Sequence, residues 1–166
     1  MKVITALFLT AIIFIGCNSK DTMDKPVIPK LVIGKSLTNL SLNDQHEKPH
    51  TLNATTKKVI FAFSKDAAHT CNDFFVTKKA TYLEDNKVIF VADVSAAPSL
   101  IRSMFIMPGL KDFKHTVLVL DDENIAASYR ANQNIEKIIV VYIKNGTISN
   151  IKSINTVDEL EKEIEN

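Results

Sequence analysis

Ala68 to Cys71 is the segment whose residue types and spacing come closest to chemistry. It follows a short apolar run, Val59 to Phe63, and opens a predicted amphipathic helix. A free cysteine has a pKa of about 8.5, and a helix N-terminus with a nearby cation lowers it towards the reactive thiolate. Cysteine also packs as a small apolar side chain without any chemistry. Cys71 is therefore either a reactive thiol at a helix start or a half-buried packing residue.

The other cysteine, Cys17, ends an N-terminal segment that is typical of a bacterial lipoprotein signal. Lys2 supplies a positive charge, and Val3 to Ile15 is an apolar run too short to span a bilayer comfortably. Gly16 precedes the cysteine as the small residue that a lipobox requires. We expect residues 1–16 to be a signal peptide and Cys17 to carry acyl chains, palmitate among them. The alternative is an ordinary secretory signal that is cut elsewhere.

Residues 17–30 are predicted to tether the following domain, residues 31–166, to the membrane. This segment holds Pro26 and Pro29 among polar and charged residues, a composition typical of a linker. Asn18 takes the place where aspartate would indicate retention at the inner membrane, so the sequence favours the outer membrane. The domain is expected to face the periplasm or the exterior of a bacterial cell envelope.

The charge balance and the cysteine count exclude several classes of function. The chain has 20 Lys and Arg against 19 Asp and Glu. Removing residues 1–16 takes away one Lys, which leaves 19 of each sign and a net charge of zero. Such a chain lacks the basic surface that nucleic acids require. With Cys17 acylated, Cys71 is the only free thiol, so an internal disulfide is impossible.

The sequence also offers too few ligands for a metal site. His69 and Cys71 lie two residues apart, and His115 lies far along the chain. Two credible ligands do not make a site that normally takes three or four. We therefore expect neither a metal nor another cofactor.

An apolar cluster, Met104 to Met107, precedes Pro108 and Gly109. We expect the cluster to belong to the core. If it were exposed beside the Cys71 helix, it would instead serve as a docking patch for a partner protein. Proline and glycine together are expected to break the helix there.

Apolar runs and turn residues alternate between predicted strands and helices. Continuous apolar runs predict buried strands, and Asn145-Gly146 predicts a two-residue hairpin turn. Thr156 followed by Glu159 predicts a capping box at the last helix. The predicted strands are 36–42, 50–52, 59–64, 88–92, 117–120, 138–143 and 148–151, and the predicted helices are 68–83, 98–106, 125–129 and 156–164. This order predicts an α/β fold with a mainly parallel sheet and antiparallel strands at its end.

The pattern resembles the thioredoxin-like superfamily, and within it the extracytoplasmic (TlpA-like) and peroxiredoxin-type branch. Ile33 to Leu37 with Leu42 to His46 resembles the N-terminal hairpin of that branch. Val59 to Cys71 resembles its active-site strand and helix start, and Val117 to Arg130 resembles its inserted unit. The resemblance implies a three-layer α/β/α fold with a central mixed sheet and an N-terminal β-hairpin.

Three positions that this resemblance makes essential for dithiol exchange hold residues that cannot perform it. The attacking cysteine falls on Ala68, the buried acid that helps deprotonate it falls on Ala62, and the proline with a cis peptide bond falls on Ile138. Exchange needs one thiolate to attack and a second thiol to resolve the mixed disulfide, and only Cys71 remains. We therefore expect no dithiol–disulfide oxidoreductase activity.

The peroxiredoxin branch leaves a single-cysteine alternative. In that alignment the peroxide-attacking cysteine falls on Cys71 and the activating arginine falls near Lys137. The threonine and proline of the motif fall on Ala68 and Ser64, and lysine is a poor substitute for a planar guanidinium. The candidate catalytic residues of a thiol-dependent peroxidase or monothiol redox protein are thus Cys71 and Lys137.

The sequence as a whole favours a lipid-anchored thioredoxin-like lipoprotein that binds or scaffolds an envelope protein. Its predicted binding site is the groove at the Ala68 end of the helix. Single-cysteine chemistry at Cys71 is the alternative from another class. A third possibility is a redox-regulated module in which Cys71 pairs with a thiol of the partner.

Overall fold

The structure, a computed structural model, describes residues 26–166. The predicted signal peptide, residues 1–16, and the predicted lipidation site Cys17 lie outside the described residues, as does most of the predicted tether, residues 17–30. Within residues 26–166, no helix has the length and apolar character needed to cross a bilayer.

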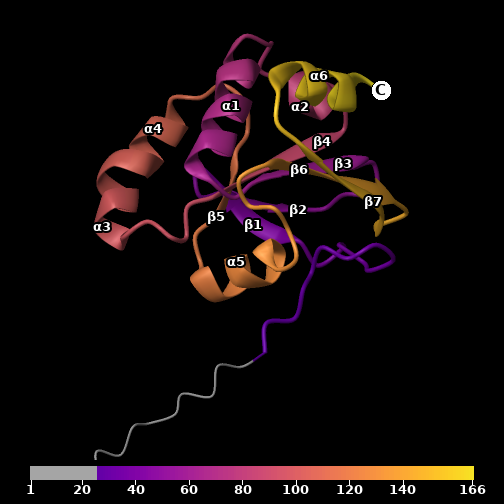
Figure 1. The fold of residues 1–166 in the computed structure, drawn as a ribbon. Helices are drawn as coiled ribbons and strands as arrows, with labels where there is room; N and C mark the ends of the chain where they lie inside the picture. Colours follow the sequence, from indigo (N-terminus) through magenta and orange to yellow (C-terminus); the bar gives the residue numbers. More distant parts are fainter. Residues whose placement is uncertain (1–25) are drawn as a thin grey trace, which may run out of the picture.

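A seven-stranded sheet forms the centre of the molecule (Figure 1). Its strands are β1 (Ser41–Asp44), β2 (Pro49–Thr51), β3 (Lys58–Ala62), β4 (Val88–Asp93), β5 (Leu118–Leu120), β6 (Ile138–Lys144) and β7 (Thr147–Ile154). Their order is β2-β1-β5-β4-β3-β6-β7. β4 runs parallel to both β3 and β5, whereas the other four pairings are antiparallel. The predicted mixed sheet and N-terminal hairpin are confirmed. The expectation of a mainly parallel sheet is wrong, because only two of the six strand pairings are parallel.

Helices cover both faces of the sheet and complete the three-layer α/β/α arrangement (Figure 1). They are α1 (Lys65–Val76), α2 (Tyr82–Asp85), α3 (Ser99–Ile101), the π-helical turn η1 (Arg102–Ile106), α4 (Met107–Lys111), α5 (Glu123–Arg130) and α6 (Val157–Glu165). One core cluster joins the sheet to α1, α2, α4 and α6, and a second joins its other face to α5 and to residues 31–40. β3 is buried along its whole length, as a central strand between two helical layers must be.

Two local predictions about chain reversal and capping are confirmed. Asn145 and Gly146 both have positive φ angles, 53° and 74°, as the two-residue turn between β6 and β7 requires. At the start of α6, the Thr156 hydroxyl accepts from the Glu159 N–H at 3.2 Å, and the Glu159 carboxylate accepts from the Thr156 N–H at 3.1 Å. This reciprocal pair is the capping box.

The helix that carries Cys71 begins earlier and ends earlier than predicted. Ser64 caps α1, since its hydroxyl accepts from the Ala67 N–H at 3.3 Å. The helix ends near Thr77, whose hydroxyl donates to the Phe74 carbonyl at 2.7 Å. Ala68 is therefore the fourth residue of α1 rather than its first, and Cys71 lies about two turns inside the helix.

The expected break at Pro108 is also wrong, because the helix continues through it as α3, η1 and α4. We call this segment, residues 99–111, the arm. Proline has no N–H to donate to the carbonyl four residues earlier, and its ring crowds that carbonyl. The chain accommodates Pro108 by widening the preceding turn, in which the Met107 N–H donates to the Arg102 carbonyl five residues back.

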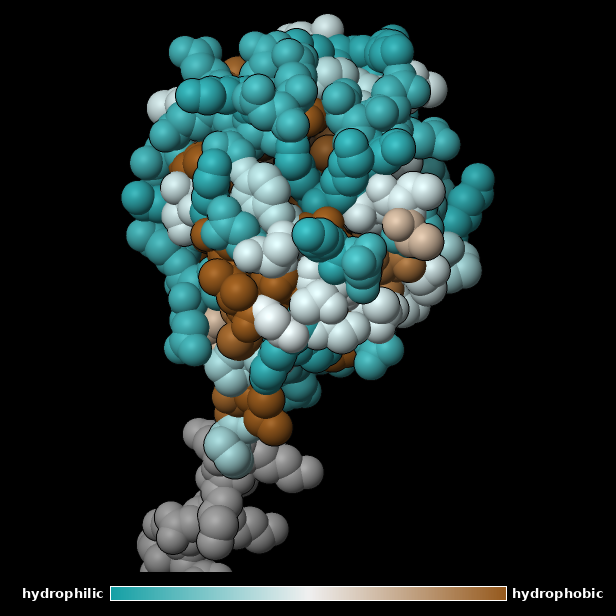
Figure 2. All heavy atoms as spheres, turned by 90° about the vertical axis from the view of Figure 1, so that its right-hand side faces the viewer, coloured by the Kyte–Doolittle hydropathy of each residue, from teal (hydrophilic) through white to brown (hydrophobic). Residues whose placement is uncertain are grey.

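The described chain joins the body of the protein at Lys30 and Leu31. The Lys30 N–H donates to the Ser128 carbonyl of α5 at 2.8 Å, and Leu31 is buried. Val27 and Ile28, which precede this point, are exposed. Figure 2 shows hydrophobic side chains gathered next to the grey N-terminal part, below a largely hydrophilic face.

Candidate functional site

Cys71 is on the core-facing side of α1, and it is fully buried. Burial raises the pKa of Cys71 far above the value of a free cysteine, because the charged thiolate loses its solvation. A thiol that is both inaccessible and more basic than usual reacts slowly. This environment matches the packing interpretation of Cys71 more closely than the catalytic one.

Two further positions of the redox alignment lie directly opposite each other in the sheet. Ala62 of β3 pairs with Ile138 of β6, and both are fully buried in the cluster that contains Cys71. Residues 26–166 contain no cis peptide bond. The structure thus brings Ala62, Ile138 and Cys71 together, but as one apolar packing unit without an acid, a second thiol or a proline.

Lys137, the other candidate catalytic residue, is half-buried in the loop before β6. The pKa of Glu159, in the first turn of α6, is lowered mainly by hydrogen bonds from the N–H groups of Asn155 and Thr156. The positive charge of Lys137 lowers it further. Burial is what shifts the pKa of Cys71. The structure therefore gives Lys137 a neighbour in α6 and offers no support for its action on the thiol.

A groove of about 580 Å³ lies between the first turns of α1, the end of β4 and the arm. Ala68 lines it, so the predicted groove at this end of the helix exists. Twelve of its sixteen lining residues are apolar or glycine, and the four others are Lys65, His69, Asn72 and Asp93. The apolar members are Phe63, Ala68, Ala92, Val94, Ala96, Ala97, Ile101, Phe105, Ile106, Gly109, Leu110 and Phe113. Cavities of this size and composition are typical of sites for small apolar ligands.

Asn72 is the most enclosed polar side chain of the α1 wall, with 6 % of its surface exposed. Its Oδ1 atom accepts from Nε2 of His115 at 2.9 Å. Its amide nitrogen makes no hydrogen bond to any residue of the described chain. Asn72, which lines the groove, therefore holds the histidine with its oxygen, and its amide nitrogen is without a partner in residues 26–166.

His115, which Asn72 holds, is buried among aromatic rings. Its ring stacks on Phe113 with centroids 5.0 Å apart and meets Phe75 edge-on at 5.2 Å. Its Nδ1 atom has no hydrogen-bond partner within residues 26–166. Burial lowers the pKa of His115 to about 4, so the ring is neutral at physiological pH.

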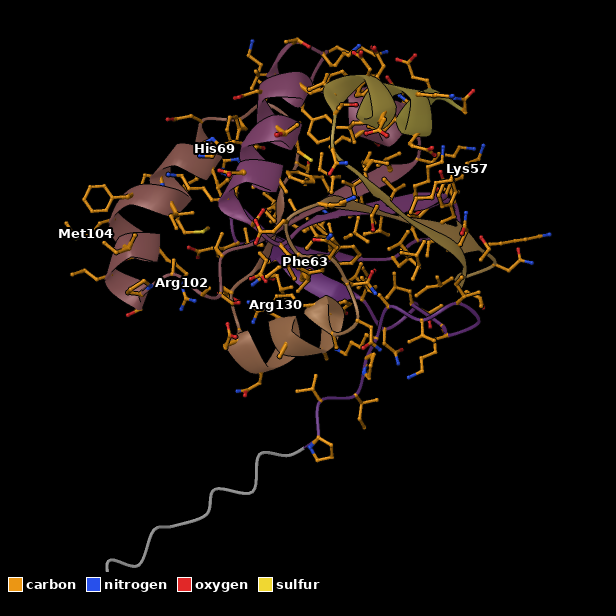
Figure 3. All side chains as sticks on the ribbon, in the orientation of Figure 1. Lys57, Phe63, His69, Arg102, Met104 and Arg130 are labelled. Atoms are coloured by element: carbon orange, nitrogen blue, oxygen red, sulfur yellow. The ribbon has the colours of Figure 1, made fainter. Side chains whose placement is uncertain are left out.

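Charged residues at the carboxyl ends of the parallel strands hold the arm against the sheet. Nη1 of Arg102 donates to the carbonyls of Ser95 at 3.0 Å and Asp121 at 2.8 Å. Nε of Arg130 lies 3.6 Å from Oδ2 of the buried Asp93 carboxylate. Figure 3 shows Arg102 and Arg130 extending from the arm and α5 towards the region of Phe63. Arg102 thus ties the arm to the backbone at the ends of β4 and β5, and Arg130 pairs with the carboxylates of Asp93 and Glu123.

The expectation that Met104 to Met107 belong to the core is wrong for Met104 and Phe105, which are exposed, whereas Ile106 and Met107 are half-buried and pack against the core. Leu100 and Met104, which do not line the groove, are 64 % and 58 % exposed, whereas Ile101 and Phe105 are exposed residues that line it. Met104 projects away from the body of the protein (Figure 3). The sequence interpretation failed because amphipathic helices next to a groove and next to a core have the same apolar periodicity.

The candidate metal ligands do not come together. His69 is exposed on α1 and lines the groove, whereas His115 and Cys71 are buried and separate. Residues 26–166 contain no group of three or more His, Cys, Asp or Glu side chains arranged to hold a metal ion.

Sequence reasoning missed Asn72 and Asp93, and it considered His115 only as a metal ligand. An amide on the apolar face of a helix, next to Phe74 and Phe75, is the one local signal that singles out Asn72. His115 is 43 residues away from Asn72 along the chain, so nothing in the local pattern connects the two side chains.

The structure is similar to solved thioredoxin-like proteins. The thioredoxin domain of a thiol-disulfide oxidoreductase from Bacteroides vulgatus superposes with a TM-score of 0.52 at 15 % identity, over 81 % of this chain and 96 % of that one. Peroxidoxin BcpB from Mycobacterium tuberculosis superposes with a TM-score of 0.51 at 14 % identity, over 80 % of this chain and 94 % of that one. No protein-family model matches the sequence, and no curated protein is significantly similar to it. Likenesses at this level of identity concern the fold alone.

Proposed function

The chain has the thioredoxin-like α/β fold, and we propose that it is a membrane-anchored lipoprotein of the bacterial cell envelope that binds a ligand or partner without dithiol exchange. The proposed binding site is the groove between α1 and the arm. Cys17 carries the proposed anchor, with the domain facing the periplasm or exterior and the outer membrane favoured.

The observation that supports this proposal best is that an open apolar groove lies next to a buried, inaccessible Cys71. The place where relatives of this fold keep a reactive thiol is here the wall residue Ala68. Behind it, Cys71, Ala62 and Ile138 pack as core. Because Cys71 is buried and does not line the groove, the groove surface is available to bind a ligand or partner.

The anchoring part of the proposal rests on the N-terminal sequence. An apolar segment ending in Gly16-Cys17 is typical of acylated proteins, and more than one acyl chain makes anchoring stable. Metabolic labelling with an alkyne analogue of palmitate tests it: the wild-type chain incorporates the label and Cys17→Ser does not. Equal labelling of both would contradict lipidation at this residue.

Complementation of a deletion strain separates binding from thiol chemistry. Cys71→Ala is expected to restore the wild-type envelope phenotype, whereas Gly109→Leu, which fills the groove, is expected to fail. Gly109 suits this test because a Cβ atom placed there meets no atom within 4 Å, so the larger side chain enters open space. A folded Cys71→Ala protein that fails to complement would instead support the single-cysteine alternative.

A further inference from the structure

We infer that the groove binds a fatty acid, with the hydrocarbon chain against the arm and the carboxylate at the α1 wall. This inference rests on the proposed function, in which the groove is the binding site, and adds the chemical class of its ligand.

The apolar part of the groove suits a hydrocarbon chain better than a peptide. The wall contributed by the arm is built from apolar residues and glycine, among them Ile101, Phe105 and Leu110. A peptide brings an N–H and a carbonyl at nearly every residue, each of which needs a partner when buried. The four polar residues that line the groove come from α1 and the end of β4, and none comes from the arm. A hydrocarbon chain needs no such partners.

The α1 wall supplies donors and positive charge for an anionic head group. Lys65, His69 and Asn72 follow one another at helical spacing on the face that lines the groove. The amide nitrogen of Asn72 is free to donate, because only its oxygen is used by His115. Lys65 is the first residue of this twelve-residue helix, whose N-terminal end favours negative charge.

The one carboxylate that lines the groove, Asp93, is buried and lies next to a cation. Oδ1 of Asp93 accepts from the Ser95 hydroxyl at 2.7 Å, and Oδ2 lies 3.6 Å from Nε of Arg130. The side chain of Asp93 is 2 % exposed, and Arg130 approaches from α5 on the other face of the sheet. Arg130, which also pairs with Glu123, thus offsets part of the negative charge that Asp93 brings to the groove.

Photolabelling of membranes that contain the full chain tests the inference. The probe is a palmitic acid analogue that carries a diazirine and an alkyne, and mass spectrometry locates its adducts. We expect adducts on the groove-lining part of residues 92–113, competition by unlabelled palmitate, and no competition by hexadecylamine, whose ammonium group would meet Lys65. A diazirine-bearing phosphatidylcholine is expected not to label these residues, which distinguishes a free fatty acid from a bilayer lipid.

Three variants assign the label to the groove. Gly109→Leu is expected to abolish labelling. Asn72→Asp keeps an acceptor for His115 but replaces the free donor with a carboxylate, and is expected to reduce labelling about tenfold or more. Leu100→Ser, on the arm but outside the groove, is the matched control and is expected to label like the wild type.

The possible failures are distinguishable. Labelling that survives Gly109→Leu or falls with Leu100→Ser would mean that the arm inserts into the bilayer, and it would overturn the inference. Equal competition by hexadecylamine would overturn the role of the α1 wall. If the wild type takes no label while Gly109→Leu still fails to complement, the fatty-acid inference falls and the proposed function stands. If Gly109→Leu complements fully, the proposed function falls as well.

Discussion

His115 should make the stability of this protein depend on pH in a range where few other groups titrate. Its ring is 2 % exposed, Nδ1 has no partner, and burial lowers its pKa from about 6.5 to about 4. The unfolded chain therefore binds a proton between these values that the folded chain does not. The free energy of unfolding must then fall as the pH falls from 6.5 towards 4, and stay constant for this residue above 6.5.

The magnitude follows from the two pKa values. A difference of this size corresponds to about 3 kcal/mol in total, at about 1.4 kcal/mol for each tenfold change in proton affinity. Between pH 7 and pH 5 the linkage relation gives a loss of about 2 kcal/mol. This interval avoids most of the titration of the carboxylates, whose reference pKa values lie near 4.

Urea unfolding followed by circular dichroism at several pH values measures this loss. His115→Phe keeps an aromatic ring among Phe75, Phe90 and Phe113 but cannot titrate, so its stability should be nearly flat between pH 7 and pH 5. His46→Gln removes an exposed imidazole and should keep the wild-type slope. A wild-type slope no steeper than that of His115→Phe would refute the assignment of the effect to this buried ring.

Three further outcomes test other parts of the structure. Cys71 in the native protein should react with iodoacetamide at least about a hundredfold more slowly than in the urea-unfolded chain, because burial raises its pKa and blocks access; comparable rates would mean that the thiol is open. Gly146→Ala should lower the free energy of unfolding by about 1–2 kcal/mol, because φ is 74° and the new Cβ would lie 2.5 Å from Cγ2 of Thr38. Adding Thr38→Ser should recover the part caused by this clash, and no recovery would leave backbone strain as the whole cause. Thr156→Ala should cost about 1 kcal/mol through loss of the capping box, and urea unfolding unchanged from the wild type would show that the cap contributes nothing.

The fold could be predicted to a large extent because its signals are local. The apolar runs at β3, β4 and β6 are long enough to identify central strands, and the Asn145-Gly146 turn and the Thr156 cap are encoded within a few residues. The direction of β6 relative to β3 has no local signal. It is set by where the chain returns after α5, which is a property of the packed sheet.

The candidate site was less predictable, because its properties depend on burial and on distant residues. The likeness to a redox motif predicts that α1 starts at Ala68, whereas Ser64 has the side chain that caps the helix. The exposure of Met104 and Phe105 follows from how the arm leaves the sheet around Pro108. The contact between Asn72 and His115 joins segments that have no sequence signal in common.

The position of the N-terminal hairpin has a consequence for the order of folding. Asn43 of β1 pairs with Val119 of β5, 76 residues later in the chain. The Gln45 side chain reinforces this edge by donating to the His115 carbonyl at 2.8 Å and accepting from the Val117 N–H at 2.9 Å. Contacts between such distant segments form slowly, because a large loop must close first. The hairpin is made before β5 and can dock only after β5 exists, so until then the free edge of β1 is open to association with other chains.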